Sequence, residues 1–156
     1  MNILIDGMGG DNAPLEIVKG AVKAADEIDG QITIIGREEE IRKAFDKIGY
    51  TKGKIEIVNA TEVVTNNEAP AMAVRKKKDS SITRGMSMVK SGEADAFLSA
   101  GSTGALLSAG LFNLGRIKGI QRPAIAAFFP KIGKNDTTLL LDCGANVDAR
   151  PSHLVQ

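Results

Sequence analysis

The sequence SAGSTGA, residues 99–105, lies between two apolar segments. Residues 94–98 before it predict a buried strand, and residues 105–114 after it predict a helix of small and apolar side chains. At a strand-to-helix turn the first backbone N–H groups of the helix lack partners and carry partial positive charge, which favours an anion. We therefore expect a small negative ligand, with phosphate as the first candidate, to contact Ser99, Gly101, Ser102, Thr103 and Gly104. The alternative is a tight connection that holds no ligand.

Two further glycine-bearing turns also follow apolar segments. DGMGGDNAP at residues 6–14 follows a strand predicted at 2–5, and DCGANVD at residues 142–148 follows one predicted at 137–141. Glycine lets a ligand approach the backbone closely, and a nearby acid or amide can take up a proton or donate a hydrogen bond. The predicted phosphate contacts here are Gly9 and Gly10, and the candidate catalytic side chains are Asp11, Asp142 and Asn146. The alternatives are helix capping by Asp11 or Asn12 and ordinary turn chemistry at 142–148.

Apolar periodicity predicts an alternation of strands and helices along the whole chain. The expected strands are 2–5, 31–35, 54–58, 94–98, 124–129 and 137–141, and the expected helices are 13–28, 38–48, 71–78, 82–90 and 105–114. This order is typical of a three-layer α/β fold, Rossmann-like, with a largely parallel sheet covered on both faces. Ligands of such sheets lie beyond the carboxyl ends of the strands, where the three turns are expected to converge. We expect residues 1–156 to form one α/β domain.

Composition argues against several classes of protein. Twenty Lys and Arg balance 19 Asp and Glu, and aromatic residues make up 4% with no Trp, which does not favour a nucleic-acid partner. Cys143 is the one cysteine, so no internal disulfide is expected and a reducing, cytoplasmic location fits. No secretion signal or membrane-spanning run is evident. With His153 as the one histidine, neither a metal site nor a cofactor is expected.

One basic cluster stands out, RKKK at residues 75–78. A solvated helix face is one interpretation. The functional interpretation is a contact with an acidic carrier protein or an anionic membrane surface, through Arg75, Lys76, Lys77 and Lys78.

Five motifs occur in order along the chain: DGMGGD (6–11), RKKKDSS (75–81), SAGSTGA (99–105), GIQRPA (119–124) and LDCGANVD (141–148). Together they resemble the PlsX family, the bacterial phosphate acyltransferases of phospholipid synthesis, and the resemblance spans the chain. It implies a fold like that of the isocitrate/isopropylmalate dehydrogenase group and a homodimer that associates peripherally with the membrane. It also implies a chain about twice this length, of which residues 1–156 are the N-terminal half. Two positions depart from the usual family motifs: this chain has Ser102 where the family usually has Asn, and Gly7 where it usually has Ala.

The resemblance implies transfer of a fatty acyl group from acyl-[acyl-carrier protein] to inorganic phosphate. Phosphate is itself a nucleophile and the leaving thiol has a pKa of about 8.5, so no protein nucleophile is required. Asp11 or Asp142 would take the phosphate proton, and Asn146 would donate a hydrogen bond. The alternatives are a dehydrogenase of the same fold group and a non-catalytic domain that binds phosphate or acyl phosphate. Neither a complete G-x-G-x-x-G motif nor a P-loop motif occurs.

Overall fold

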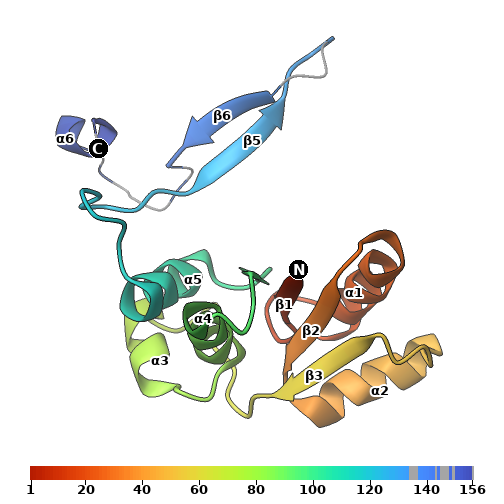
Figure 1. Ribbon diagram of the computed structural model, residues 1–156. Helices are drawn as coiled ribbons and strands as arrows, with labels where there is room; N and C mark the ends of the chain where they lie inside the picture. The colour runs from red at the N-terminus through yellow and green to blue at the C-terminus, as the bar shows by residue number, and fades with distance from the viewer. Residues whose placement is uncertain (134–136, 143, 145–147, 149, 156) are drawn as a thin grey trace. The chain divides into compact units, whose positions relative to one another are not determined.

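Four parallel strands form the central sheet of the protein. A computed structural model describes residues 1–133, 137–142, 144, 148 and 150–155. The strands are β1 (Asn2–Asp6), β2 (Gln31–Gly36), β3 (Ile55–Asn59) and β4 (Ala96–Leu98). Their order is β3-β2-β1-β4, and Figure 1 labels the first three of these strands. Ile5 of β1 pairs with Ile34 of β2 on one side and with Leu98 of β4 on the other.

Helices cover both faces of this sheet, because its inner strands are apolar on both sides. Ile5, Ile32 and Ile34 pack against α1 (Leu15–Glu27) and α2 (Glu38–Ile48). Leu4 and Ile35 face the other way, into a cluster with Met88 and Val89 of α4 (Ser81–Ser91). Alternate residues of a strand point to opposite faces, which explains why the neighbouring Ile34 and Ile35 pack into different layers.

A second helical cluster extends the layer beyond α4. It joins α3 (Pro70–Lys76), α4 and α5 (Thr103–Ala109), and α5 continues directly into the π-helical turn η1 (Gly110–Leu114). Gly85 allows α4 to lie close to β4, since a Cβ atom there would stand 2.2 Å from the Phe97 ring. This packing sets the direction in which the chain leaves β4.

Most predicted elements of this sheet are confirmed to within about two residues, with one error in local detail. Neither Asp11 nor Asn12 caps α1: Pro14 occupies the N-cap position, without a side-chain hydrogen bond. The peptide bond between Ala13 and Pro14 is cis. The predicted helix at 105–114 starts two residues earlier, at Thr103, and changes to π geometry at Gly110.

Residues Gly115–Gln156 form a second compact unit, distinct from the unit Met1–Leu114, and each is described by itself. The second unit holds β5 (Ala126–Pro130), β6 (Thr137–Leu141) and α6 (Pro151–Leu154). Both predicted strands exist, but they pair with each other in antiparallel fashion, against the expectation of further parallel strands. Only six residues, 131–136, connect them, whereas a parallel pair needs a crossover of a dozen or more. Cys143 and Asn146 lie outside the described residues, and the single-domain organisation stays a prediction.

Candidate functional site at the ends of β1 and β4

The turns that follow β1 and β4 lie side by side at one edge of the sheet. The chain runs from β1 outward to β2 and β3, and then returns to place β4 on the other side of β1. The order of the strands therefore reverses between β1 and β4. In open parallel sheets, ligands bind in the crevice outside the carboxyl ends of the strands at this reversal. The predicted site residues of residues 6–14 and 99–105 border this position.

The two turns touch each other through their glycines. A Cβ atom on Gly9 would stand 2.9 Å from the Gly101 nitrogen, 2.9 Å from the Ser99 Oγ and 2.5 Å from the Asp6 Oδ2. Gly10, with φ of 105°, lies over the Ala100 carbonyl oxygen. The turns thus meet as predicted, but Gly9 is buried against protein atoms and its missing side chain leaves room for the neighbouring turn.

A buried carboxylate links the two turns. Asp6, the last residue of β1, is 1% exposed. Its Oδ2 accepts a hydrogen bond of 2.7 Å from the Ser99 hydroxyl, and its Oδ1 accepts one of 3.1 Å from the Met8 N–H. The Ser99 Oγ in turn accepts a bond of 3.1 Å from the Gly101 N–H. The sequence analysis did not single out Asp6 as a site residue, because the sequence shows an acid at the end of β1 but not the direction in which its carboxylate points.

The start of α5 supplies a smaller set of free donors than predicted. The Gly101 N–H is already bound to Ser99, and the Ser102 Oγ caps the helix by accepting the Ala105 N–H at 3.3 Å. Within the described part of the chain, we find no acceptor for the N–H groups of Ser102, Thr103 and Gly104. These three groups remain available to a ligand.

Two predicted site residues have surroundings that the sequence did not reveal. Gly104 packs against α3, because a Cβ atom there would stand 2.9 Å from the Pro70 Cγ. Asp11 is exposed, in the turn that follows Gly10. Gly104 therefore serves helix packing, whatever its N–H binds.

The third predicted turn belongs to the second unit. Asp142 has φ of 62°, a left-handed conformation that is uncommon outside glycine, and its N–H donates to the Ile125 carbonyl at 2.7 Å. Asn146 lies outside the described residues. That Asp142 and Asn146 share a site with the other two turns stays a prediction.

Comparison with known proteins bears on this arrangement. A model of the family described as "Fatty acid synthesis protein" matches residues 1–156. The chain belongs to this family. It is 49% identical over 157 residues to a phosphate acyltransferase of Halothermothrix orenii and 53% identical over 158 residues to one of Desulfitobacterium hafniense. Each alignment covers all of this chain and 46% of the relative, so the chain spans about half the length of these relatives. The resemblance to PlsX is thereby confirmed.

Solved structures share the fold of this family member. A phosphotransacetylase from Streptococcus pyogenes superposes with a TM-score of 0.70 at 23% identity, over 99% of this chain and 50% of that one. The EutD phosphotransacetylase from Staphylococcus aureus gives 0.64 at 18% identity, over 96% of this chain and 48% of that one. These similarities support the α/β fold with a parallel sheet.

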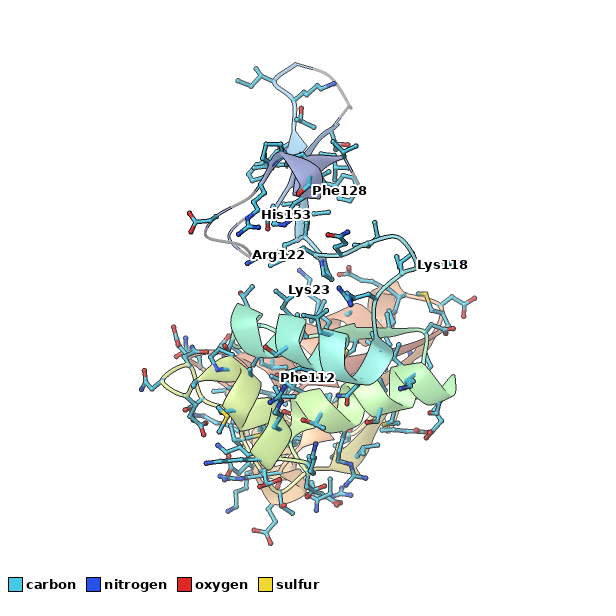
Figure 2. The ribbon with its side chains drawn as sticks, turned by 90° about the vertical axis from the view of Figure 1, so that its left-hand side faces the viewer. Lys23, Phe112, Lys118, Arg122, Phe128 and His153 are labelled. Carbon is cyan, nitrogen blue, oxygen red and sulfur yellow. The ribbon has the colours of Figure 1, made fainter. Side chains whose placement is uncertain are left out.

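The basic cluster of this family member does not form one charged face. Lys77 is turned inward, where its Nζ donates to the Val63 carbonyl at 2.6 Å and pairs with the Glu68 carboxylate at 2.7 Å. The hydrogen bond from Lys77, together with the backbone and hydroxyl donors of Thr65, lowers the pKa of Glu68 to about 2. The Arg75 guanidinium lies 4.7 Å from the centre of the Phe112 ring on η1. Figure 2 labels Phe112. Lys76 and Lys78 are exposed.

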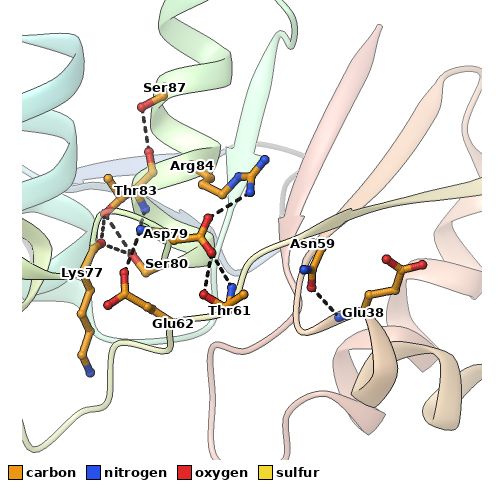
Figure 3. Close-up of polar contacts among 10 residues, drawn as sticks. All are labelled: Glu38, Asn59, Thr61, Glu62, Lys77, Asp79, Ser80, Thr83, Arg84 and Ser87. Atoms are coloured by element: carbon orange, nitrogen blue, oxygen red, sulfur yellow. Dashed lines mark hydrogen bonds and ion pairs between the residues drawn. The ribbon is translucent and has the colours of Figure 1, made fainter.

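A second polar network holds the start of α4 (Figure 3). The Asp79 Oδ2 accepts hydrogen bonds from the Thr61 hydroxyl and N–H, and its Oδ1 pairs with Arg84 at 2.9 Å. These contacts, led by the Thr61 hydroxyl, lower the pKa of Asp79 to about 2. The buried Ser80 caps α4 by accepting the Thr83 N–H. Much of the RKKKDSS motif therefore makes contacts that hold the loop of residues 61–69 and the start of α4.

The described residues contain neither a candidate metal-binding cluster nor a candidate membrane-spanning helix. In that part of the chain, no three His, Cys, Asp or Glu side chains gather into a group that could hold a metal ion. None of the helices found there combines the length and the apolar character that crossing a bilayer requires.

Proposed function

We propose that the full-length protein containing this chain transfers a fatty acyl group from acyl-[acyl-carrier protein] to inorganic phosphate, which yields acyl phosphate for phospholipid synthesis. Family membership and relatives named phosphate acyltransferase support this proposal. The observation that carries it is the meeting of two glycine-bearing turns at the strand-order reversal between β1 and β4. There, the N–H groups of Ser102, Thr103 and Gly104 lie at a helix start and have no acceptor among the described residues.

The reaction depends more on correct placement of phosphate and thioester than on a nucleophilic side chain of the protein. A phosphate oxygen bonds to the thioester carbonyl carbon, the carbonyl oxygen gains negative charge, and the C–S bond then breaks. The carrier thiolate leaves and takes a proton, because a thiol has a pKa of about 8.5. The N–H groups at the start of α5 would hold the phosphate or the oxyanion, and such fixed donors can supply much of the rate enhancement.

The remaining roles belong to the same proposal. Asp11, exposed beside Gly10, would accept the phosphate proton, with Asp142 as the second candidate and Asn146 as a donor to the oxyanion. Lys76, Lys78 and Arg75 would contact the acidic carrier protein or an anionic membrane surface. We further propose a cytoplasmic homodimer, peripherally associated with the membrane, with a fold like that of the isocitrate/isopropylmalate dehydrogenase group.

The direct test incubates full-length protein with acyl-carrier thioester and inorganic phosphate. We expect free carrier thiol to appear only when phosphate is present, with one acyl phosphate, trapped by hydroxylamine, for each thiol released. Sulfate in place of phosphate is the matched control, because it has a similar shape but gives no stable acyl product.

Three outcomes would contradict the proposal. Thiol release without phosphate would indicate a thioesterase. Reduction of NAD with a hydroxy acid would indicate the dehydrogenase alternative. Saturable phosphate binding without thiol release would indicate a binding domain.

A further inference from the structure

We propose that Asp6 is a positioning residue that fixes the anion-binding turn through the hydroxyl of Ser99. The expected effect on the KM for phosphate rests on the proposed function. The expected effect on the structure of the turn does not. Asp6 stands at the end of β1, one strand away from the turn that it would control.

The carboxylate of Asp6 is buried and has hydrogen-bond donors as its partners. Within the described residues, no Lys, Arg or His forms an ion pair with it. Its two oxygens instead accept from the Ser99 hydroxyl and the Met8 N–H. A buried charge is retained only where such partners offset the loss of water. Both turns are therefore held to the same carboxylate.

The direction of the hydrogen bonds fixes the turn after β4. The Ser99 hydroxyl donates its single hydrogen to the Asp6 Oδ2. The Ser99 oxygen then presents a lone pair, which the Gly101 N–H uses at 3.1 Å. That bond sets the orientation of the peptide between Ala100 and Gly101. The next residues, Ser102 to Gly104, carry the N–H groups that have no acceptor in the described part of the chain.

The packing around Asp6 leaves this arrangement little freedom. Gly9 lies so close that a Cβ atom on it would stand 2.5 Å from the Asp6 Oδ2 and 2.9 Å from the Ser99 Oγ. The backbone of the first turn therefore packs directly against the hydrogen bond between Asp6 and Ser99. A preorganised donor set of this kind costs less ordering when a ligand binds.

The kinetic test compares Asp6→Asn, Ser99→Ala and the double variant in the full-length protein. Asn matches Asp in size, but one of its two terminal groups donates, so it cannot accept from both Ser99 and Met8. If Asp6 acts through Ser99, each single variant should raise the KM for phosphate about tenfold, with a smaller change in kcat. The KM of the double variant for phosphate should be no higher than the higher of the two single-variant values, because both changes remove one shared interaction.

A stability control separates positioning from general loosening of the fold. Ile55→Val on β3 removes one buried methyl group two strands away from β1. It should lower the unfolding midpoint while leaving the KM for phosphate unchanged. If Asp6→Asn behaves in the same way, or if the two single effects simply add, Asp6 has no positioning role.

A second measurement does not depend on activity. Hydrogen exchange at the Gly101 amide, followed by NMR, should accelerate at least tenfold in Asp6→Asn and in Ser99→Ala, while exchange in β2 stays as in the parent. Unchanged Gly101 exchange would overturn the inference even in an active enzyme. Accelerated exchange in a protein that makes no acyl phosphate would support the Asp6 role and reject the proposed function instead.

Discussion

Ser102 caps α5, a task that the usual family residue, Asn, could also perform. Its hydroxyl caps α5 by accepting the Ala105 N–H at 3.3 Å. Serine and asparagine are equally favoured at this position, but only asparagine adds an amide donor. The departure at Gly7 has a packing reason, since a Cβ atom there would stand 2.7 Å from the Ile34 Cγ2 and 3.2 Å from the Ile41 Cδ1.

Substitutions at Ser102 should separate capping from ligand binding. Ser102→Ala should lower the free energy of unfolding by about 1 kcal/mol, because the cap is lost. Ser102→Asn should leave it within about 0.5 kcal/mol of the parent and tighten phosphate binding through the added donor. Urea unfolding and calorimetric titration with phosphate measure the two effects. Equal stability of the Ala and Asn variants would contradict the capping role.

Gly9 and Gly20 form a matched pair for the effect of one added methyl group. Gly9→Ala places a Cβ atom 2.9 Å from the backbone nitrogen of Gly101, so the turns must separate, at a cost of about 1–3 kcal/mol. Gly20 lies within α1 with nothing within 4 Å of such an atom, so Gly20→Ala should stabilise by about 0.5–1 kcal/mol. Thermal unfolding of both variants should shift in opposite directions. A Gly9→Ala protein as stable as the parent would mean that the turns are not in contact.

At the scale of an element, the helix α3 is held by its own charged run. Lys77 reaches back to the loop before the helix, while Lys76 and Lys78 remain in solvent. A run of four cations does not show in sequence which of them turns inward. That choice depends on the path of residues 61–69, which brings the Val63 carbonyl and the Glu68 carboxylate to one side of the helix.

The Lys77–Glu68 contact should make stability depend on pH in the acid range. The pKa of Glu68 is about 2 in the folded protein against an ordinary 4.5, so its stabilising contribution is complete above about pH 4.5 and is lost as the pH falls toward 2. Glu68→Gln should be less stable than the parent at pH 7 and equally stable near pH 2, measured as urea midpoints. Glu39→Gln, an exposed site on α2, is the control. A difference that persists at pH 2 would contradict this account.

The strands and helices themselves were largely predictable, but the contacts between residues distant in sequence were not. Apolar periodicity located β1 to β4 and their helices, because each strand and helix buries a regular pattern of side chains. The meeting of the turns after β1 and β4 followed from the parallel order. Asp6 was missed because only the structure shows that its carboxylate turns toward Ser99 and not toward water. The roles of Gly9 and Gly104 in packing depend on neighbours distant in sequence.

At the scale of the whole molecule, the hairpin of β5 and β6 is the element that the sequence placed least well. The strands were found, but their pairing depends on the length of the connection between them. Large apolar side chains stay exposed on the hairpin, including Phe128 (72%, labelled in Figure 2), Phe129, Leu139 and Leu140. A two-stranded hairpin with such a surface is marginally stable by itself and prone to association.

The 156-residue chain should therefore self-associate through this hairpin. Phe128 and Leu139 lie opposite each other in the ladder, so Phe128→Thr with Leu139→Thr should lower both light scattering and binding of an apolar dye. Met72→Thr, which removes one exposed apolar side chain on α3, should change neither. Equal scattering by the double variant and the parent would show that association arises elsewhere.

The contact between Gly9 and Gly101 also limits how this protein can be re-engineered. Because the backbone of one loop fills the space where the other would carry a side chain, the two loops are complementary in shape. If only one loop were replaced by that of a relative, its shape would not match the loop beside it. Chimaeras that exchange both loops together, with Asp6 and Ser99, should keep the strand ends in register where single exchanges would not.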